Sequence, residues 1–278
     1  MAGRPVIFGE ILFDCFPDGS RVFSGAPLNV CRNLKYLGYE PLMISRIGQD
    51  ALGDTVLEEM RKIDLDTAGV QVDETHATGQ VIVTLDGNEP QFDIALGQAW
   101  DFIATDEARE TVSGLDISFV YTGTLALRQE TSMRSFYGVL ELIDAPLFFD
   151  VNLRQAWWSS ELVDDLLGRA TWLKCNADEY EALFGDADPP IIREKYELDV
   201  LIQTRGGDGA AIAFPGAFVQ GKPPELAGAL QDTVGAGDAF ASMVISGLDR
   251  GQSPEAILES ALLKGAEVAR IRGADWKA

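Results

Sequence analysis

The chain has 278 residues, of which 46% are hydrophobic, so it can bury one substantial core, and we expect a single domain over residues 1–278. Asp and Glu outnumber Lys and Arg by 44 to 22, and the net charge of -22 argues against nucleic acid or an anionic membrane as a partner. The 3 cysteines lack metal-binding spacing, and the sequence shows neither a signal-peptide pattern nor an apolar run near the about 20 residues of a membrane span, so we expect a cytoplasmic protein without disulfides or zinc.

Short apolar runs alternate with helical patterns in the first part of the chain. The expected elements are a strand at 6–12, a helix at 28–37, a strand at 42–47 and a helix at 54–63. Residues 79–85 and 90–95 then alternate with a period of two around the turn 86–88, which indicates a hairpin. We expect the region 79–95 and the segment 11–22 to form a small β lid.

The rest of the chain alternates regularly between helix and strand. The expected elements are a helix at 106–112, a strand at 117–121, a helix at 130–143, a strand at 147–151, a helix at 162–169 and strands at 172–174 and 200–204. Antiparallel strands at 210–214 and 218–220 and helices at 236–248 and 254–270 complete the list. This order is typical of parallel strands covered by helices on both faces. It predicts an α/β fold, a three-layer α/β/α sandwich with a mainly parallel central sheet.

The segment 232–240 carries the clearest chemical pattern, because the glycine-rich turn Gly235-Ala236-Gly237 leads directly into an apolar helix. Backbone N–H groups in such a turn, together with the helix dipole, suit a phosphoryl group in transfer. Asp238, in the first helical turn, could accept a proton from an attacking hydroxyl. The alternative is a tight turn followed by a helix-capping carboxylate.

Two other glycine-rich patterns fail on inspection. Residues 216–223 match a phosphate-binding P-loop except that Pro223 replaces the Ser or Thr that binds Mg2+. The GxGxxG dinucleotide pattern is missed because Phe240 and Ile212 stand where its third small residue should be. A nicotinamide-dependent oxidoreductase is therefore disfavoured.

The segment 232–240 resembles the signature of the ribokinase-like (PfkB) carbohydrate kinases. Earlier segments of the chain resemble other motifs of that family and occur in the family's order. Residues 24–29 (SGAPLN) resemble its sugar-binding GGAPxN motif, 150–154 (DVNLR) its DxNxR segment, 176–179 (NADE) its NxxE motif and 204–209 (TRGGDG) its nucleotide turn. Ser24 replaces the first glycine of the sugar motif, and Val234 replaces a usual threonine before the glycine turn.

This resemblance implies an ATP-dependent kinase, with ATP and Mg2+ as cofactors, that phosphorylates a primary hydroxyl of a small sugar. It assigns catalysis to Asp238, Gly235, Ala236, Gly237 and Arg154. It assigns sugar binding to Asp14, Gly25, Asn29 and Asp238.

The resemblance also implies a nucleotide site. Its residues would be Asn176, Glu179, Thr204, Gly206, Gly209 and Gly237, with Glu179 reaching Mg2+ through water. A helix N-cap with its reciprocal capping residue is the alternative for Asn176 and Glu179. Asp232, with the carbonyls of Val234 and Gly273, resembles a site for an activating monovalent cation such as K+, although Asp232 could instead cap the turn.

In motif style the chain is most similar to the fructokinases, which implies D-fructose as substrate and fructose 6-phosphate as product. A 2-keto-3-deoxygluconate kinase, a ribokinase and a nucleoside kinase of the same family are alternatives, because lid contacts decide the substrate. A catalytically silent sugar-sensing relative is an alternative of a different class. The resemblance further implies a homodimer formed through the lid.

Overall fold

The computed structural model describes residues 3–86, 89–154, 157–231 and 233–271. Its large sheet has nine strands in the order β13-β12-β11-β10-β9-β8-β1-β4-β5. These are β1 (Arg4–Phe8), β4 (Leu42–Gly48), β5 (Val70–Asp73), β8 (Ile117–Gly123), β9 (Leu147–Asp150), β10 (Trp172–Asn176), β11 (Val200–Thr204), β12 (Ala210–Phe214) and β13 (Ala217–Gly221). The strands from β5 to β11 in this order run parallel, whereas β12 and β13 join antiparallel, so the expected mainly parallel sheet is confirmed.

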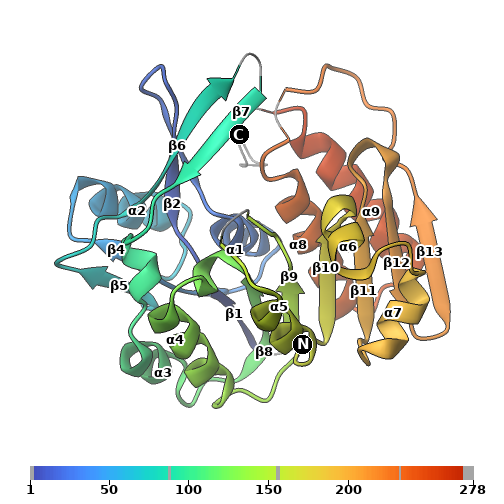
Figure 1. Cartoon of the computed structure of the whole chain (residues 1–278), viewed down its shortest axis with the longest axis horizontal. Helices are drawn as coiled ribbons and strands as arrows, with labels where there is room; N and C mark the ends of the chain where they lie inside the picture. The colour runs from blue at the N-terminus through green and yellow to red at the C-terminus, as the bar shows by residue number, and fades with distance from the viewer. Residues whose placement is uncertain (1–2, 87–88, 155–156, 232, 272–278) are drawn as a thin grey trace.

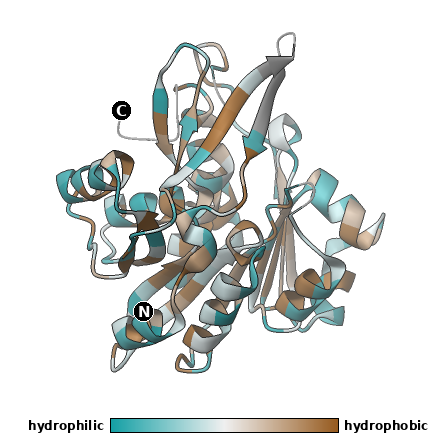
Figure 2. Ribbon diagram, turned by 60° about the vertical axis from the view of Figure 1, so that its left-hand side comes forward, coloured by the Kyte–Doolittle hydropathy of each residue, from teal (hydrophilic) through white to brown (hydrophobic). Residues whose placement is uncertain are grey.

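Helices cover both faces of this sheet (Figure 1). On one face lie α1 (Ala26–Tyr36), α2 (Ala51–Lys62), α8 (Ala236–Asp249) and α9 (Pro254–Val268), which share a core cluster with alternate strand residues. On the other lie α3 (Thr105–Val112), α4 (Glu130–Leu140), α5 (Ser160–Leu167), α6 (Ala177–Phe184) and α7 (Pro189–Lys195). Figure 2 shows hydrophobic colour on the strands between these layers and a mixture of hydrophilic and hydrophobic colour on the helices outside them. The three-layer α/β/α prediction is confirmed.

A second sheet of four strands has the order β3-β2-β6-β7. It consists of β2 (Leu12–Cys15), β3 (Arg21–Ser24), β6 (Gly79–Asp86) and β7 (Glu89–Ile94). β2 pairs antiparallel with β3 and parallel with β6, so it joins two segments that are far apart in the sequence. In Figure 1, β6 and β7 rise above the large sheet, and we call this sheet the lid.

The single strand expected at residues 6–12 is wrong, because the chain leaves β1 after Phe8 and begins β2 at Leu12. A Cβ atom at Gly9 would lie 2.2 Å from the Cγ atom of Pro27, so the start of α1 packs directly against the backbone there. The apolar run therefore serves two sheets, and Glu10 lies at the crossing between them.

Three elements were not expected from the sequence: β5, α6 and α7, of 4, 8 and 7 residues. Each is too short for its periodicity to stand out against neighbouring loops. Within the described ranges, no helix is both long and apolar enough to cross a membrane.

Candidate active site

The carboxyl ends of β9, β10 and β11 lie at one edge of the large sheet because the three strands are parallel. Asp150 ends β9, Asn176 ends β10 and Thr204 ends β11. Lys174 stands beside Asp150 in the register of the sheet, and Asn176 stands beside Thr204. This edge therefore gathers polar residues from segments that are 20 to 30 positions apart.

Helix α1 begins close to the crossing between the two sheets. Its N-cap is Gly25, whose φ of 123° lies in the region that side chains rarely adopt. A Cβ atom at Gly25 would also lie 2.5 Å from the backbone oxygen of Glu10. Glycine is thus required at this position both by conformation and by space, and it sets where the following helix residue Asn29 lies.

Helix α8 begins after Gly235, which has a left-handed backbone with φ of 79°. Among the described residues, no side chain caps the start of this helix. The carboxylate of Asp238 faces α1 instead, where its Oδ2 atom accepts a hydrogen bond of 2.8 Å from Nδ2 of Asn29. Asp238 therefore joins two helices and does not close its own helix, as the capping alternative required.

The electrostatic surroundings of Asp238 suit a proton acceptor. Burial raises its pKa to about 6, the hydrogen bond from Asn29 opposes this rise, and the negative charge of Asp150 adds to it. The positive charges of Lys174 and Arg154 lower the pKa again. The carboxylate is thus ionised at neutral pH and is more basic than an exposed aspartate.

A buried ion pair lies beneath the glycine turn. Nζ of Lys174 lies 2.8 Å from both carboxylate oxygens of Asp150, and the Tyr121 hydroxyl donates to Oδ2 of Asp150 at 3.1 Å. Burial alone would lower the pKa of Lys174, but the charge and hydrogen bond of Asp150, together with the charges of Glu179 and Asp238, outweigh it and the pKa is raised. Nζ lies 3.8 Å from the point where Gly237 would carry a Cβ atom, so a permanent positive charge sits under the start of α8.

Asn176 and Glu179 form a reciprocal capping pair at the start of α6, which is the alternative to nucleotide binding considered for them above. Oδ1 of Asn176 accepts from the Glu179 N–H at 2.9 Å, and Oε2 of Glu179 accepts from the Asn176 N–H at 2.8 Å. Oε1 of Glu179 also accepts from the Leu153 N–H at 2.9 Å. Glu179 thereby anchors the loop that carries the exposed Arg154.

The turn after β11 is shaped by two glycines. Gly206 and Gly209 have φ values of 55° and 99°, and the Arg205 N–H donates to the Gly209 oxygen at 2.7 Å. A Cβ atom at Gly209 would lie 1.8 Å from the backbone oxygen of Gly221, so no other residue fits. The turn continues directly from Thr204 at the same sheet edge as Asn176.

The structure describes two of the remaining predicted site residues. Asp14 is buried on lid strand β2. Val234 directly precedes the N-cap of α8. Asp232 and Gly273 lie outside the described residues.

Comparison with known proteins decides the family. The sequence matches the pfkB family of carbohydrate kinases over residues 16–275, which is most of the chain. The chain belongs to the pfkB carbohydrate kinase family. Its fold is accordingly the ribokinase-like one that the sequence motifs implied.

Three known proteins are similar to the chain over most of its length. It is 25% identical to the fructokinase of Salmonella typhimurium over 272 residues, covering 91% of this chain and 87% of that protein. It is 26% identical to the 2-dehydro-3-deoxygluconokinase of Thermoproteus tenax over 263 residues, covering 90% and 80%. A double-mutant fructokinase of Vibrio cholerae, solved with fructose, ADP and a potassium ion bound, superposes with a TM-score of 0.83 at 22% identity, covering 98% and 94%.

Three residues of this pfkB chain that sequence reasoning did not assign lie near Asp238. Glu10 is 3% exposed, and burial raises its pKa to about 7, while Arg154 opposes the rise and Asp238 adds to it. The other two are Lys174 and Tyr121. The available signal was a charged residue inside an otherwise apolar run of the sequence, which Glu10 and Lys174 both show.

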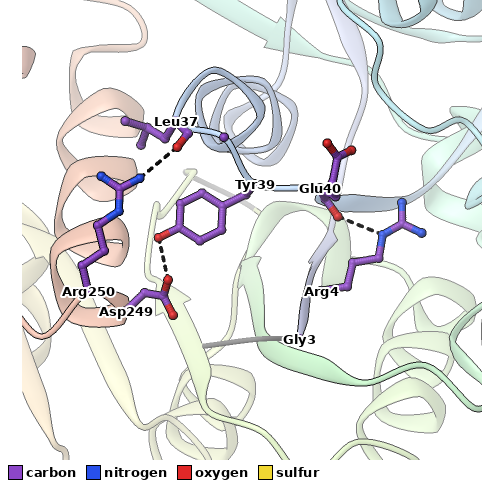
Figure 3. Close-up of a pocket in the computed structure, with 8 residues that line it drawn as sticks. Gly3, Arg4, Leu37, Tyr39, Glu40, Asp249 and Arg250 are labelled. Atoms are coloured by element: carbon purple, nitrogen blue, oxygen red, sulfur yellow. Dashed lines mark hydrogen bonds between the residues drawn. The ribbon is translucent and has the colours of Figure 1, made fainter.

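A cavity of about 400 Å³ lies at the opposite ends of β1, α1 and α8 (Figure 3). The Tyr39 hydroxyl donates to Oδ2 of Asp249 at 2.8 Å, and Nη2 of Arg250 donates to the Leu37 oxygen at 2.9 Å. Of the predicted site residues that the structure describes, none lines it. Helices α1 and α8 are thus joined at both ends, by Asn29 with Asp238 and by Tyr39 with Asp249.

Proposed function

We propose that this carbohydrate kinase transfers the γ-phosphoryl group of ATP to a primary hydroxyl of D-fructose, giving fructose 6-phosphate and ADP. The observation that carries the proposal is Asp238, a carboxylate with a pKa of about 6 that Asn29 holds at the N-terminus of α8 beside a glycine turn. A positioned base and an anion-binding turn at one point are what phosphoryl transfer to an alcohol needs.

In this mechanism Asp238 takes the proton of the attacking hydroxyl. The hydroxyl oxygen forms a bond to the γ-phosphorus, and the bond from that phosphorus to the bridging oxygen breaks as ADP leaves. The backbone N–H groups of Gly235 and Gly237 would stabilise the charge on the phosphoryl oxygens, joined by that of Ala236 once it exchanges its hydrogen bond of 3.2 Å to the Thr233 oxygen for one to the phosphate. Lys174 beside Gly237 and Arg154, whose charge lowers the pKa of Asp238, would supply positive charge.

The sugar and nucleotide sides use separate groups. Asp14, Gly25 and Asn29 would bind sugar hydroxyls, because short acceptors and amides suit a polyol in a cleft. Asn176, Glu179, Thr204, Gly206, Gly209 and Gly237 would hold the nucleotide. Both Glu179 oxygens accept backbone N–H groups and keep further lone pairs, which fits contact with a metal through water. Mg2+ on the nucleotide would neutralise charge on its phosphates.

Fructose is the first expectation for the substrate. The motif style and the Salmonella fructokinase support it, and the Thermoproteus relative supports 2-keto-3-deoxygluconate as the second candidate. We expect fructose to give the highest kcat/KM in an ATP-consumption assay over hexoses, pentoses, 2-keto-3-deoxygluconate and nucleosides. A larger kcat/KM for another acceptor would replace fructose as the proposed substrate but would leave the assignment as a kinase unchanged. If none of these acceptors supports ATP consumption, the result would instead favour a catalytically silent sugar-sensing relative.

A monovalent cation is a further expectation, assigned to Asp232, Val234 and Gly273. We expect K+ to raise kcat over tetramethylammonium at matched ionic strength, because a bound cation would help to order the turn before α8. The Vibrio cholerae structure of this fold contains a potassium ion. Equal rates in the two salts would remove this site from the proposal.

Two further expectations belong with this function. A homodimer formed through the lid would use exposed apolar groups such as Ile82, which is 47% exposed on β6. We also expect the protein in the cytoplasm, because that compartment supplies ATP and keeps cysteines reduced.

A further inference from the structure

Arg32 on α1 is a buried cation whose guanidinium contacts an amide oxygen. The residue is 6% exposed, and its Nε atom is buried with no hydrogen-bond partner. Its Nη2 atom donates a hydrogen bond of 3.0 Å to Oδ1 of Asn29. Across the residues that the structure describes, Arg32 forms no ion pair.

Such an arrangement is costly, because a guanidinium removed from water needs a compensating charge or a full set of acceptors. Lys174, the other deeply buried cation near the site, has Asp150 as its counterion. Arg32 has an amide oxygen instead. Because burying this cation costs stability, we infer that its contact with Asn29 has a functional role.

The contact fixes which way the Asn29 amide faces. A guanidinium has only donors, so the atom of Asn29 that faces Arg32 must be the carbonyl oxygen. The NH2 group must then face the other way, where it donates to Oδ2 of Asp238 at 2.8 Å. Without Arg32, the amide could rotate and present its oxygen to the Asp238 carboxylate.

We propose that Arg32 is a positioning residue for phosphoryl transfer: it locks the Asn29 amide so that its NH2 group, and not its oxygen, faces Asp238. This inference rests on the proposed function, since it assigns Asp238 as the base. Arg32 acts through Asn29 and need not touch either substrate.

The proposal predicts a change in the pH profile. An amide oxygen facing Asp238 would repel the carboxylate, so its pKa would rise above the present value of about 6. The charged and titratable groups around Asp238 are Glu10 after β1, Tyr121 on β8, Asp150 on β9, Arg154 after β9 and Lys174 on β10. Replacing Arg32 leaves these groups in place but removes the guanidinium charge behind Asn29, so a shift in the profile would report loss of the Arg32–Asn29 contact, through the turned amide and the lost charge together.

The test compares Arg32→Met, Arg32→Lys and a control, Tyr39→Phe, in the intact chain. For Arg32→Met we expect kcat to fall about tenfold or more, as for loss of a charged hydrogen bond, and the acidic midpoint of the kcat profile to move to higher pH. Arg32→Lys keeps a donor toward Asn29 and should recover most of kcat and the wild-type midpoint.

Tyr39→Phe removes a hydrogen bond between the same helices at their far ends. It should lower the melting temperature but leave the midpoint in place. An unchanged midpoint in folded Arg32→Met, or the same shift in Tyr39→Phe, would overturn the proposal. If Arg32→Met does not fold, Arg32→Gln takes its place, because a glutamine amide can face Asn29 with either group and should still move the midpoint. If the wild-type protein phosphorylates none of the acceptors, the proposed function fails. That result is distinct from the failure of the Arg32 proposal, which requires an active wild-type enzyme.

Discussion

Replacing Asp238 with asparagine is expected to lower kcat by about 10² to 10⁴, the usual contribution of a positioned general base. Asparagine keeps the size of the side chain and can still accept the hydrogen bond from Asn29, but it cannot take the hydroxyl proton. The N–H groups at the start of α8 remain, so KM for ATP and for the sugar should change much less. Steady-state kinetics on the folded variant measure both quantities.

Ser242→Ala provides a matched control, because the Ser242 hydroxyl donates to the backbone oxygen of Asp238 at 2.7 Å and leaves the carboxylate untouched. This variant should keep kcat. A helix-capping role for Asp238 would allow asparagine to serve equally well. Near-normal kcat in folded Asp238→Asn would therefore contradict the mechanism.

In the proposed mechanism, the same carboxylate would set the pH dependence of the wild-type enzyme. Burial raises the pKa of Asp238 to about 6, so the base is ionised above that pH and becomes protonated as the pH falls through it. We expect kcat to fall about tenfold for each pH unit below this value, since only the ionised form accepts a proton.

Lys174→Met is expected to lower the free energy of unfolding by about 3 to 5 kcal/mol, because it leaves the carboxylate of Asp150 buried without its counterion. The side chains of the pair are 8% and 3% exposed, so water cannot replace the lost partner. kcat should fall as well, since the positive charge beneath Gly237 is removed. Chemical denaturation and kinetics on the same preparation measure the two effects.

A second replacement separates stability from catalysis. Combining Lys174→Met with Asp150→Leu removes both charges and should recover most of the lost stability, because apolar residues often replace a buried ion pair without loss. kcat should stay low. Tyr121→Phe keeps the ion pair and should cost only about 0.5 to 1.5 kcal/mol. Recovery of kcat in the double variant would show that the charge of Lys174 has no part in phosphoryl transfer.

Local pattern was sufficient for most of the fold. The alternation of helix and strand through residues 106–204 predicted the parallel sheet and its two helix layers, because periodicity depends on which face of each element is buried. The apolar run at 6–12 misled the same reasoning, since its residues are buried in two different sheets. Only the packing of Gly9 against Pro27 shows where one strand ends.

The sequence by itself determined the family, the order of the motifs and the separate proposals for Asn29 and Asp238. Only the tertiary structure brought these two side chains together, across 209 positions of the chain. The charge of Arg32, which has no ion-pair partner among the described residues, and the paired charge of Lys174 could not be distinguished in advance. The reason is physical: the state of a buried charge depends on which element packs beside it, and neighbours in space such as β9 and β10 are set by the whole fold.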